Sequence, residues 1–115
     1  MNLNLKKSEI LLTSRIGFEF EFYSNYDINK TVTLLSRELN KKISIETKAH
    51  SDFKPTADHF KVEPDMSGGA KLIELVTGSL PYQDARLIMI KVLKWIKDNG
   101  KTGERCGIHM NISYN

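Results

Sequence analysis

Residues 15–23, Arg-Ile-Gly-Phe-Glu-Phe-Glu-Phe-Tyr, alternate strictly between apolar and polar side chains. Because strand side chains project alternately to two faces, the phenylalanines can face a core while Glu19 and Glu21 share the other face. Two residues of strand separate the Glu backbones by roughly 6.5 to 7 Å. Both carboxylates can therefore lean toward one divalent cation or a close pair, which prefer oxygen ligands. A half-buried strand with a solvated acidic face is the alternative.

Two longer segments have helical periodicity. Ile28, Val32, Leu35 and Leu39 recur at helical spacing and predict a helix over about residues 28–41. Asp27 can accept hydrogen bonds from the first turn of this helix as its N-cap. Residues 82–99 carry an apolar stripe with Met89 and Trp95, both of which we expect in the core, and Asn99-Gly100 ends this second helix.

Shorter alternating or apolar runs predict the remaining strands, over residues 43–47, 59–63, 70–77 and 108–114. The polar stretch 48–58 is expected to be a loop flanked by surface histidines, His50 and His59. These elements predict an α+β fold with a mainly antiparallel β-sheet and two helices packed on one face. Residues 1–13 are expected to form an amino-terminal arm or edge strand before one domain over residues 14–115.

Two of these strands carry further groups that can bind a metal. Glu74 shares its strand face with Ala70, Leu72 and Val76, so its carboxylate must be paired, coordinate a metal or stay protonated. A buried salt bridge to Lys or Arg is the structural alternative. His109 shares the polar side of the last strand with Asn111 and Ser113. A lone strand histidine is more often structural, but its combination with Glu19, Glu21 and Glu74 favours a metal site.

Composition narrows the classes of function. The 115 residues contain 17 Lys and Arg against 14 Asp and Glu, a formal charge of +3 that is spread along the chain. The absence of a long basic block disfavours nucleic-acid binding. The sequence has no continuous apolar segment for a membrane span or a secretion signal.

Cys106 is the only cysteine in the sequence, which indicates a reducing, cytoplasmic compartment. As a catalytic nucleophile it would need a neighbouring base, and His109 follows three residues later. Residues three apart on a strand project to opposite faces, so the sequence disfavours this pair as a catalytic dyad.

Three motifs in this order carry a family resemblance. They are Gly-Phe-Glu-Phe-Glu-Phe from Gly17, Asp-Met-Ser from Asp65 with Glu-Leu-Val-Thr-Gly from Glu74, and Arg-Cys-Gly-Ile-His-Met-Asn-Ile-Ser from Arg105. Together they resemble the amidoligase family of carboxylate-amine ligases, which is similar in plan to glutamine synthetase and glutamate-cysteine ligase. Each motif alone would be weak, whereas the paired-Glu strand and the histidine strand together are fairly specific.

The resemblance implies a glutamine synthetase-like antiparallel sheet whose concave face holds ATP and Mg²⁺ or Mn²⁺. Glu19, Glu21, Glu74 and His109 match the family's metal positions. The other matching positions are Asp65, implied as the catalytic acid or base near the substrate, and Ser67, Arg105, Asn111 and Ser113, implied in cofactor binding. From the residues alone, Asp65 and Ser67 can equally be turn residues, and Arg105 can be an exposed loop arginine.

The implied activity joins a small-molecule or peptide carboxylate to an amine through an acyl phosphate. The resemblance covers residues 14–115 and corresponds to the amino-terminal half of the family's catalytic domain. We therefore expect a ligase domain or fragment, completed by a homo-oligomer or by a partner chain that extends the sheet. The alternative is a non-catalytic binding or assembly module that retains this fold.

Overall fold

A computed structural model describes residues 14–47, 53–64 and 72–113. Its elements in chain order are β1 (Arg15–Ser24), α2 (Ile28–Leu39), β2 (Lys42–Ile45), β3 (His59–Pro64), β4 (Leu72–Val76), β5 (Leu80–Pro81), α3 (Tyr82–Asn99), β6 (Gly100–Lys101) and β7 (Gly107–Ser113). These elements confirm the predicted α+β class, with one sheet of mostly antiparallel strands and two helices. The expected arm over residues 1–13 lies outside the described residues.

Strand β1 is the central strand of the sheet. Its residues 15–16 pair with β5 and its residues 19–23 pair with β4. Along its other edge, β1 pairs with β7 over residues 15–21 and with β6 at residues 23–24. Each of these four pairings is antiparallel, so β1 fixes the register of every strand next to it.

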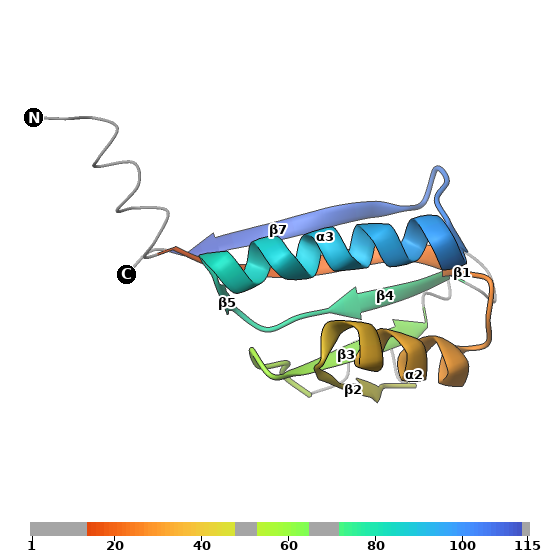
Figure 1. The fold of residues 1–115 in the computed structure, drawn as a ribbon, viewed down its shortest axis with the longest axis horizontal. Coiled ribbons are helices and arrows are strands. Elements are labelled where there is room, and N and C mark those ends of the chain that lie inside the picture. Colours follow the sequence, from red (N-terminus) through yellow and green to blue (C-terminus); the bar gives the residue numbers. More distant parts are fainter. Residues whose placement is uncertain (1–13, 48–52, 65–71, 114–115) are drawn as a thin grey trace, which may run out of the picture.

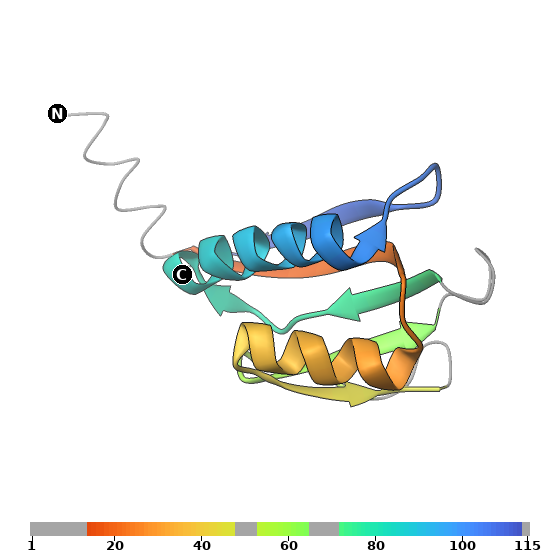
Figure 2. The same ribbon diagram turned by 45° about the vertical axis from the view of Figure 1, so that its right-hand side comes forward.

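The sheet continues from β4 through β3 to β2 (Figure 1). Strand β3 is antiparallel to β4, whereas β2 is parallel to β3, which makes the sheet mixed. Helix α2 packs against β2, helix α3 packs against β1, and the two helices contact one another. Figure 2 shows both helices on the same side of the sheet, as the sequence predicts.

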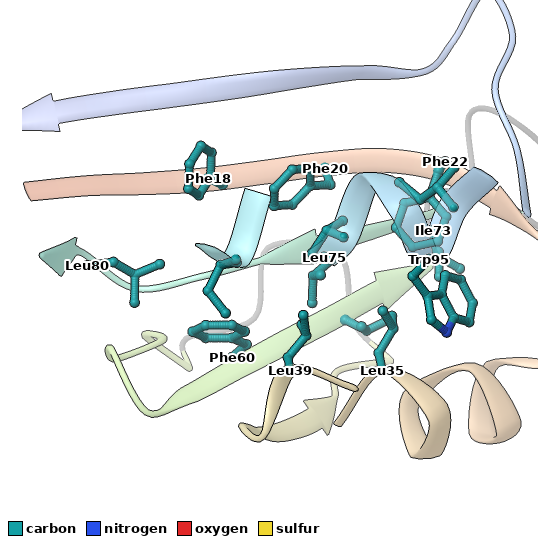
Figure 3. Packing of buried hydrophobic residues seen from close by; sticks show 14 of the residues in the cluster. Phe18, Phe20, Phe22, Leu35, Leu39, Phe60, Ile73, Leu75, Leu80 and Trp95 are labelled. Atoms are coloured by element: carbon teal, nitrogen blue, oxygen red, sulfur yellow. The ribbon is translucent and has the colours of Figure 1, made fainter. Parts of the chain in front are cut away.

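The core lies between this side of the sheet and the two helices (Figure 3). Phe18, Phe20 and Phe22 of β1 are at most 2% exposed, which confirms that their side of the alternation is the inner one. Trp95 of α3 packs edge-on against Phe22, with ring centroids 5.9 Å apart. The other buried members of the core are Leu35, Leu39, Phe60, Val62, Ile73, Leu75, Leu80, Ala85, Ile88, Val92 and Ile96.

Local chemistry explains where α2 begins and ends. The Asp27 carboxylate accepts a hydrogen bond of 2.8 Å from the backbone N–H of Lys30, which confirms the predicted N-cap. Asn40 adopts the left-handed conformation after the last turn, with a φ of 52°. Asparagine tolerates this conformation better than most residues, so it ends the helix and turns the chain into β2.

One histidine differs from its expected environment. His59 was expected at the surface, but it is half-buried and its Nε2 lies 2.6 Å from the Ser44 hydroxyl. Its ring also packs edge-on against Phe53. The parallel pairing of β2 with β3 causes this difference, because it brings Ser44 beside β3, and His50 lies outside the described residues.

Neither α2 nor α3 is long and apolar enough to cross a membrane. This statement covers the helices of the described residues.

Candidate functional site

The polar face of β1 is the side of the sheet away from the helices. Glu19 and Glu21 both lie on it and are half-buried. Phe18 and Phe20 point to the opposite side, into the core. Because the buried phenylalanines fix which way the strand faces, the two carboxylates cannot turn inward without exposing the aromatic rings.

Three carboxylates form a row across this face. Glu21 of β1 is directly opposite Glu74 of β4, and Glu74 is directly opposite Glu63 of β3. Residues opposite one another in antiparallel strands point to the same face with Cβ atoms about 4.5 to 5.5 Å apart. Like charges so placed repel, which makes this row a place where a cation is electrostatically favoured.

A second row of side chains lies on the same face, two residues further along each strand. In this row Lys61, Val76, Glu19 and His109 are successive cross-strand neighbours on β3, β4, β1 and β7. The His109 Nδ1 atom is 3.5 Å from Glu19 Oε2, and the histidine side chain is 69% exposed. The register thus brings all four predicted metal ligands, Glu19, Glu21, Glu74 and His109, onto one face.

Lys61 and Glu63 are residues of this face that the sequence prediction missed. The Lys61 Nζ atom lies 2.8 Å from Glu63 Oε1, and the two side chains are only 11% and 12% exposed. Glu63 Oε1 is buried without a hydrogen-bond partner among the described residues, so the pair is a charge contact without hydrogen-bond geometry. Alternation of polar and apolar residues over His59–Pro64 was the signal that could have placed them here.

These neighbours also refine the expected surroundings of Glu74. The sequence placed this carboxylate among apolar side chains, and Leu72 and Val76 do flank it on its own strand. Across the strands, however, its neighbours are the carboxylates of Glu21 and Glu63. Glu74 is half-buried and has an interaction with the surrounding protein.

The predicted cofactor-binding residues Asn111 and Ser113 occupy the same face near the end of β7. Asn111 is opposite Gly17, and the Ser113 hydroxyl donates a 3.5 Å hydrogen bond to the Arg15 carbonyl. A cavity of about 270 Å³ lies here, lined by Gly17, Thr77, Gly78, Ser79, Asn111, Ile112 and Ser113. It lies on the part of β1 next to Glu19.

The remaining predicted residues are less closely tied to this face. Arg105 lies exposed in the turn before β7. Asp65 and Ser67 lie outside the described residues. Cys106 lines a cavity between α3 and β7, whereas His109 projects to the carboxylate face, in agreement with the prediction that the two form no dyad.

The donor set suits a hard divalent cation, because carboxylate oxygens and an imidazole nitrogen are ligands that Mg²⁺ or Mn²⁺ accepts. In the part of the chain that the structure describes, no three His, Cys, Asp or Glu side chains converge closely enough to hold one ion. The chemistry of the residues therefore fits a metal, while their side chains are arranged in rows and not as a closed cage.

Comparison with known proteins identifies the family. Residues 12–115 match the family model described as "Putative amidoligase enzyme". Neither the curated proteins nor the solved structures contain a significant match to the chain.

Proposed function

Because this chain belongs to the amidoligase family, we propose that it takes part in ATP- and Mg²⁺- or Mn²⁺-dependent ligation of a carboxylate to an amine. The observation that carries the proposal is the strand register, which places Glu19, Glu21 and Glu74 together on the face opposite the core. A ligase that binds ATP against this acidic face needs a cation there, because the carboxylates would otherwise repel the negatively charged phosphates of ATP.

Glu19, Glu21, Glu74 and His109 are the residues that would hold the metal. Lys61 places one positive charge beside Glu63, and the other carboxylates of the face leave an excess of negative charge. When bound, the metal supplies charge neutralisation and alignment for the phosphate oxygens. Glu19 and His109, which already contact one another, would hold the edge of the site next to β7.

The proposed reaction has two steps. An oxygen of the carboxylate substrate attacks the γ-phosphorus of ATP, and the bond between the γ-phosphorus and the bridging oxygen of the β-phosphate breaks. ADP departs, and the substrate is now an acyl phosphate. The amine nitrogen then attacks the acyl carbon, the carbon–oxygen bond to phosphate breaks, and an amide and inorganic phosphate result. A base must accept the proton that the amine loses, and we assign this role to Asp65.

The cavity beside Gly17 suits the nucleotide. Its lining combines glycine backbone with the polar side chains of Asn111 and Ser113, so a phosphate could approach the main chain closely there. Ser67 and Arg105 complete the proposed cofactor contacts, with the arginine as a partner for phosphate. The substrates are a small-molecule or peptide carboxylate and amine, and we place the reaction in the cytoplasm, which supplies ATP.

Isothermal titration tests the metal site. We expect the intact chain to bind Mn²⁺ together with a non-hydrolysable ATP analogue. Glu21→Gln and His109→Ala should weaken Mn²⁺ binding by at least about tenfold, because each removes a donor from the site. Glu38→Gln, on the exposed side of α2, is the matched control and should leave binding unchanged.

Urea denaturation without metal separates a site from a structural network. If the Glu21→Gln and His109→Ala variants keep the wild-type midpoint, their loss of binding is a loss of ligands. If the two variants are instead destabilised without metal as strongly as their metal binding is weakened, the proposed role of these residues as ligands is contradicted. Absence of both metal and nucleotide binding by the intact chain would contradict the ligase proposal and favour a non-catalytic binding or assembly module.

A further inference from the structure

Arg15 is a cation of the carboxylate face, and the structure shows it without an acidic partner. It lies at the start of β1, on the same side of the strand as Glu19 and Glu21. Lys61 of β3, a second cation of this face, is paired with Glu63 at 2.8 Å. By contrast, the ion pairs formed among the described residues do not include Arg15. Its positive charge is therefore available to a ligand.

Two hydrogen bonds to Ser79 fix the direction of the Arg15 side chain. Its Nη2 donates to the Ser79 carbonyl at 2.7 Å, and its Nε donates to the Ser79 hydroxyl at 3.3 Å. Leu80, the next residue, is opposite Ile16, so Ser79 lies beside Gly17. The guanidinium group thus points along β1 toward Gly17 and the carboxylates.

This direction brings the guanidinium group next to the cavity of about 270 Å³ beside Gly17. Its partner Ser79 lines the cavity, and so does Ser113, the residue opposite Arg15 on β7. The described residues of the lining are glycines and residues with neutral side chains, without any Asp or Glu. Arg15 therefore gives a neutral cavity a positively charged edge.

The groups around the cavity are hydrogen-bond donors suited to an oxyanion. A guanidinium group has five N–H donors, and the two bonds to Ser79 leave three of them for a ligand. The Ser79 hydroxyl accepts from Arg15, so its own proton can still be donated. The Asn111 amide adds donors from β7. Charged donors of this kind bind phosphate oxygens strongly.

Gly17 leaves the middle of the cavity open. It is directly opposite Asn111 on β7. A Cβ atom at Gly17 would make only ordinary contacts with the described residues, the nearest at 3.5 Å from the Gly78 carbonyl oxygen. Packing among these residues therefore does not require glycine here. The missing side chain instead leaves room for a ligand to approach the main chain.

The cavity lies at one end of the proposed metal site. Gly17 is two residues from Glu19 along β1, roughly 7 Å of strand, so one polyphosphate chain can extend from a metal at Glu19 to the cavity. Arg105 lies at the other end of the face, because it precedes β7 and Gly107 at the start of β7 is opposite Glu21. A phosphate in the cavity therefore has Arg15, and not Arg105, as its neighbouring arginine.

We propose that Arg15, held in place by Ser79, binds the nucleotide phosphate that occupies this cavity. The N–H groups that Ser79 leaves unused can contact two phosphate oxygens at once, which the single ammonium group of a lysine does not reproduce. Arg15 would thereby neutralise the phosphate that lies farthest from the carboxylate row. This inference rests on the proposed nucleotide-dependent function, and it names a binding residue outside the three sequence motifs.

Titration calorimetry in the presence of Mn²⁺ tests this role with two ligands, a non-hydrolysable ATP analogue and inorganic tripolyphosphate. Arg15→Gln should weaken the binding of both by at least about tenfold, because it removes a charged hydrogen-bond donor. Arg15→Lys should recover only part of this loss, because it restores the charge without the planar group. Mn²⁺ alone should bind both variants as it binds the wild type, since Arg15 is not a metal ligand.

Arg37→Gln is the matched control. It removes the same charge from an exposed position of α2, on the helix side of the sheet (Figure 2). The binding of both phosphate ligands should stay unchanged in this variant. Urea denaturation without ligands should give Arg15→Gln and Arg37→Gln similar unfolding midpoints, which shows that a loss of binding is not a loss of folding.

The outcomes distinguish this inference from the proposed function. If the wild type binds the nucleotide and Arg15→Gln binds it equally well, the inference is wrong and the proposed function stands. If Arg15→Gln loses affinity for the ATP analogue but not for tripolyphosphate, Arg15 contacts another part of the nucleotide and the inference is wrong. A loss of Mn²⁺ binding in Arg15→Gln would make the arginine a structural support of the face, which also contradicts the inference. If the wild type binds neither phosphate ligand, both proposals fail.

Discussion

Lys61 and Glu63 form a largely buried ion pair within the carboxylate face. Their separation of two residues on β3 points both side chains to the same side, which makes their contact a direct result of strand periodicity. Removing two charges from water is costly, so such a pair persists only when each charge offsets the other. Lys61 thereby also moderates the repulsion between Glu63 and Glu74.

Replacing one member of this pair should destabilise the protein. We expect Lys61→Met to lower the free energy of unfolding by roughly 2 to 4 kcal/mol, because Glu63 keeps a buried charge without its partner. The double variant Lys61→Met, Glu63→Leu should recover much of that loss. Urea denaturation of the single and double variants measures the coupling between the two residues.

Glu38→Gln on α2 serves as the control for removing a charge at an exposed position. Its unfolding midpoint should stay close to that of the wild type. If Lys61→Met were as stable as this control, the ion pair would be a surface contact of little energetic consequence.

The junction between β4 and β5 holds one edge of β1 in place. The pairing of β1 shifts by one residue between the two strands, since Glu19 is opposite Val76 but Ile16 is opposite Leu80. Thr77 bridges the shift, because its hydroxyl accepts a 3.0 Å hydrogen bond from the Phe18 N–H. Gly78 then donates its N–H to the Thr56 carbonyl at 3.2 Å, which ties the junction to the segment before β3.

Gly78→Ala should therefore disturb this junction. A Cβ atom at Gly78 would lie 2.3 Å from the backbone carbonyl carbon of Thr56, so the main chain would have to move. We expect a loss of about 1 to 3 kcal/mol in the free energy of unfolding, measured by urea denaturation.

Gly107→Ala in β7 is the matched control for this substitution. A Cβ atom there meets nothing within 4 Å among the described residues, so this variant should fold with stability close to the wild type. A loss of equal size in both variants would show that the loss of a glycine as such, and not the contact with Thr56, is responsible.

Strand β7 carries different groups of residues on the two faces of the sheet. One side carries the row that ends in His109, and the other side carries the exposed residues Ile108, Met110 and Ile112. The same strand is thus the edge of the proposed metal site.

The helices and most of the strands were predictable because their signals are local. The phenylalanine alternation of β1 fixed its inner face, and the periodicity around Trp95 predicted α3, whose described bounds agree with the expected 82–99. The strand expected over residues 43–47 is described as Lys42–Ile45, a shift at its ends only. Strand boundaries depend on pairing partners, which a local pattern does not contain.

The carboxylate face was predictable in part. Glu19, Glu21, Glu74 and His109 were each assigned to a strand face from alternation, and the register places those faces side by side. Lys61 and Glu63 were missed because an alternating polar residue on a strand is ordinarily solvated. Their burial became evident only when β3 was placed next to β4.

The sequence by itself determined which side chains share a face, because strand and helix periods follow from backbone geometry alone. Only the tertiary structure decided which strands are neighbours, and therefore that Glu21, Glu74 and Glu63 form one row. It also decided that α3 packs over β1, which leaves Ile108, Met110 and Ile112 of β7 exposed among the described residues. Pairing between strands distant in sequence depends on the burial of the whole core, and a local pattern cannot specify it.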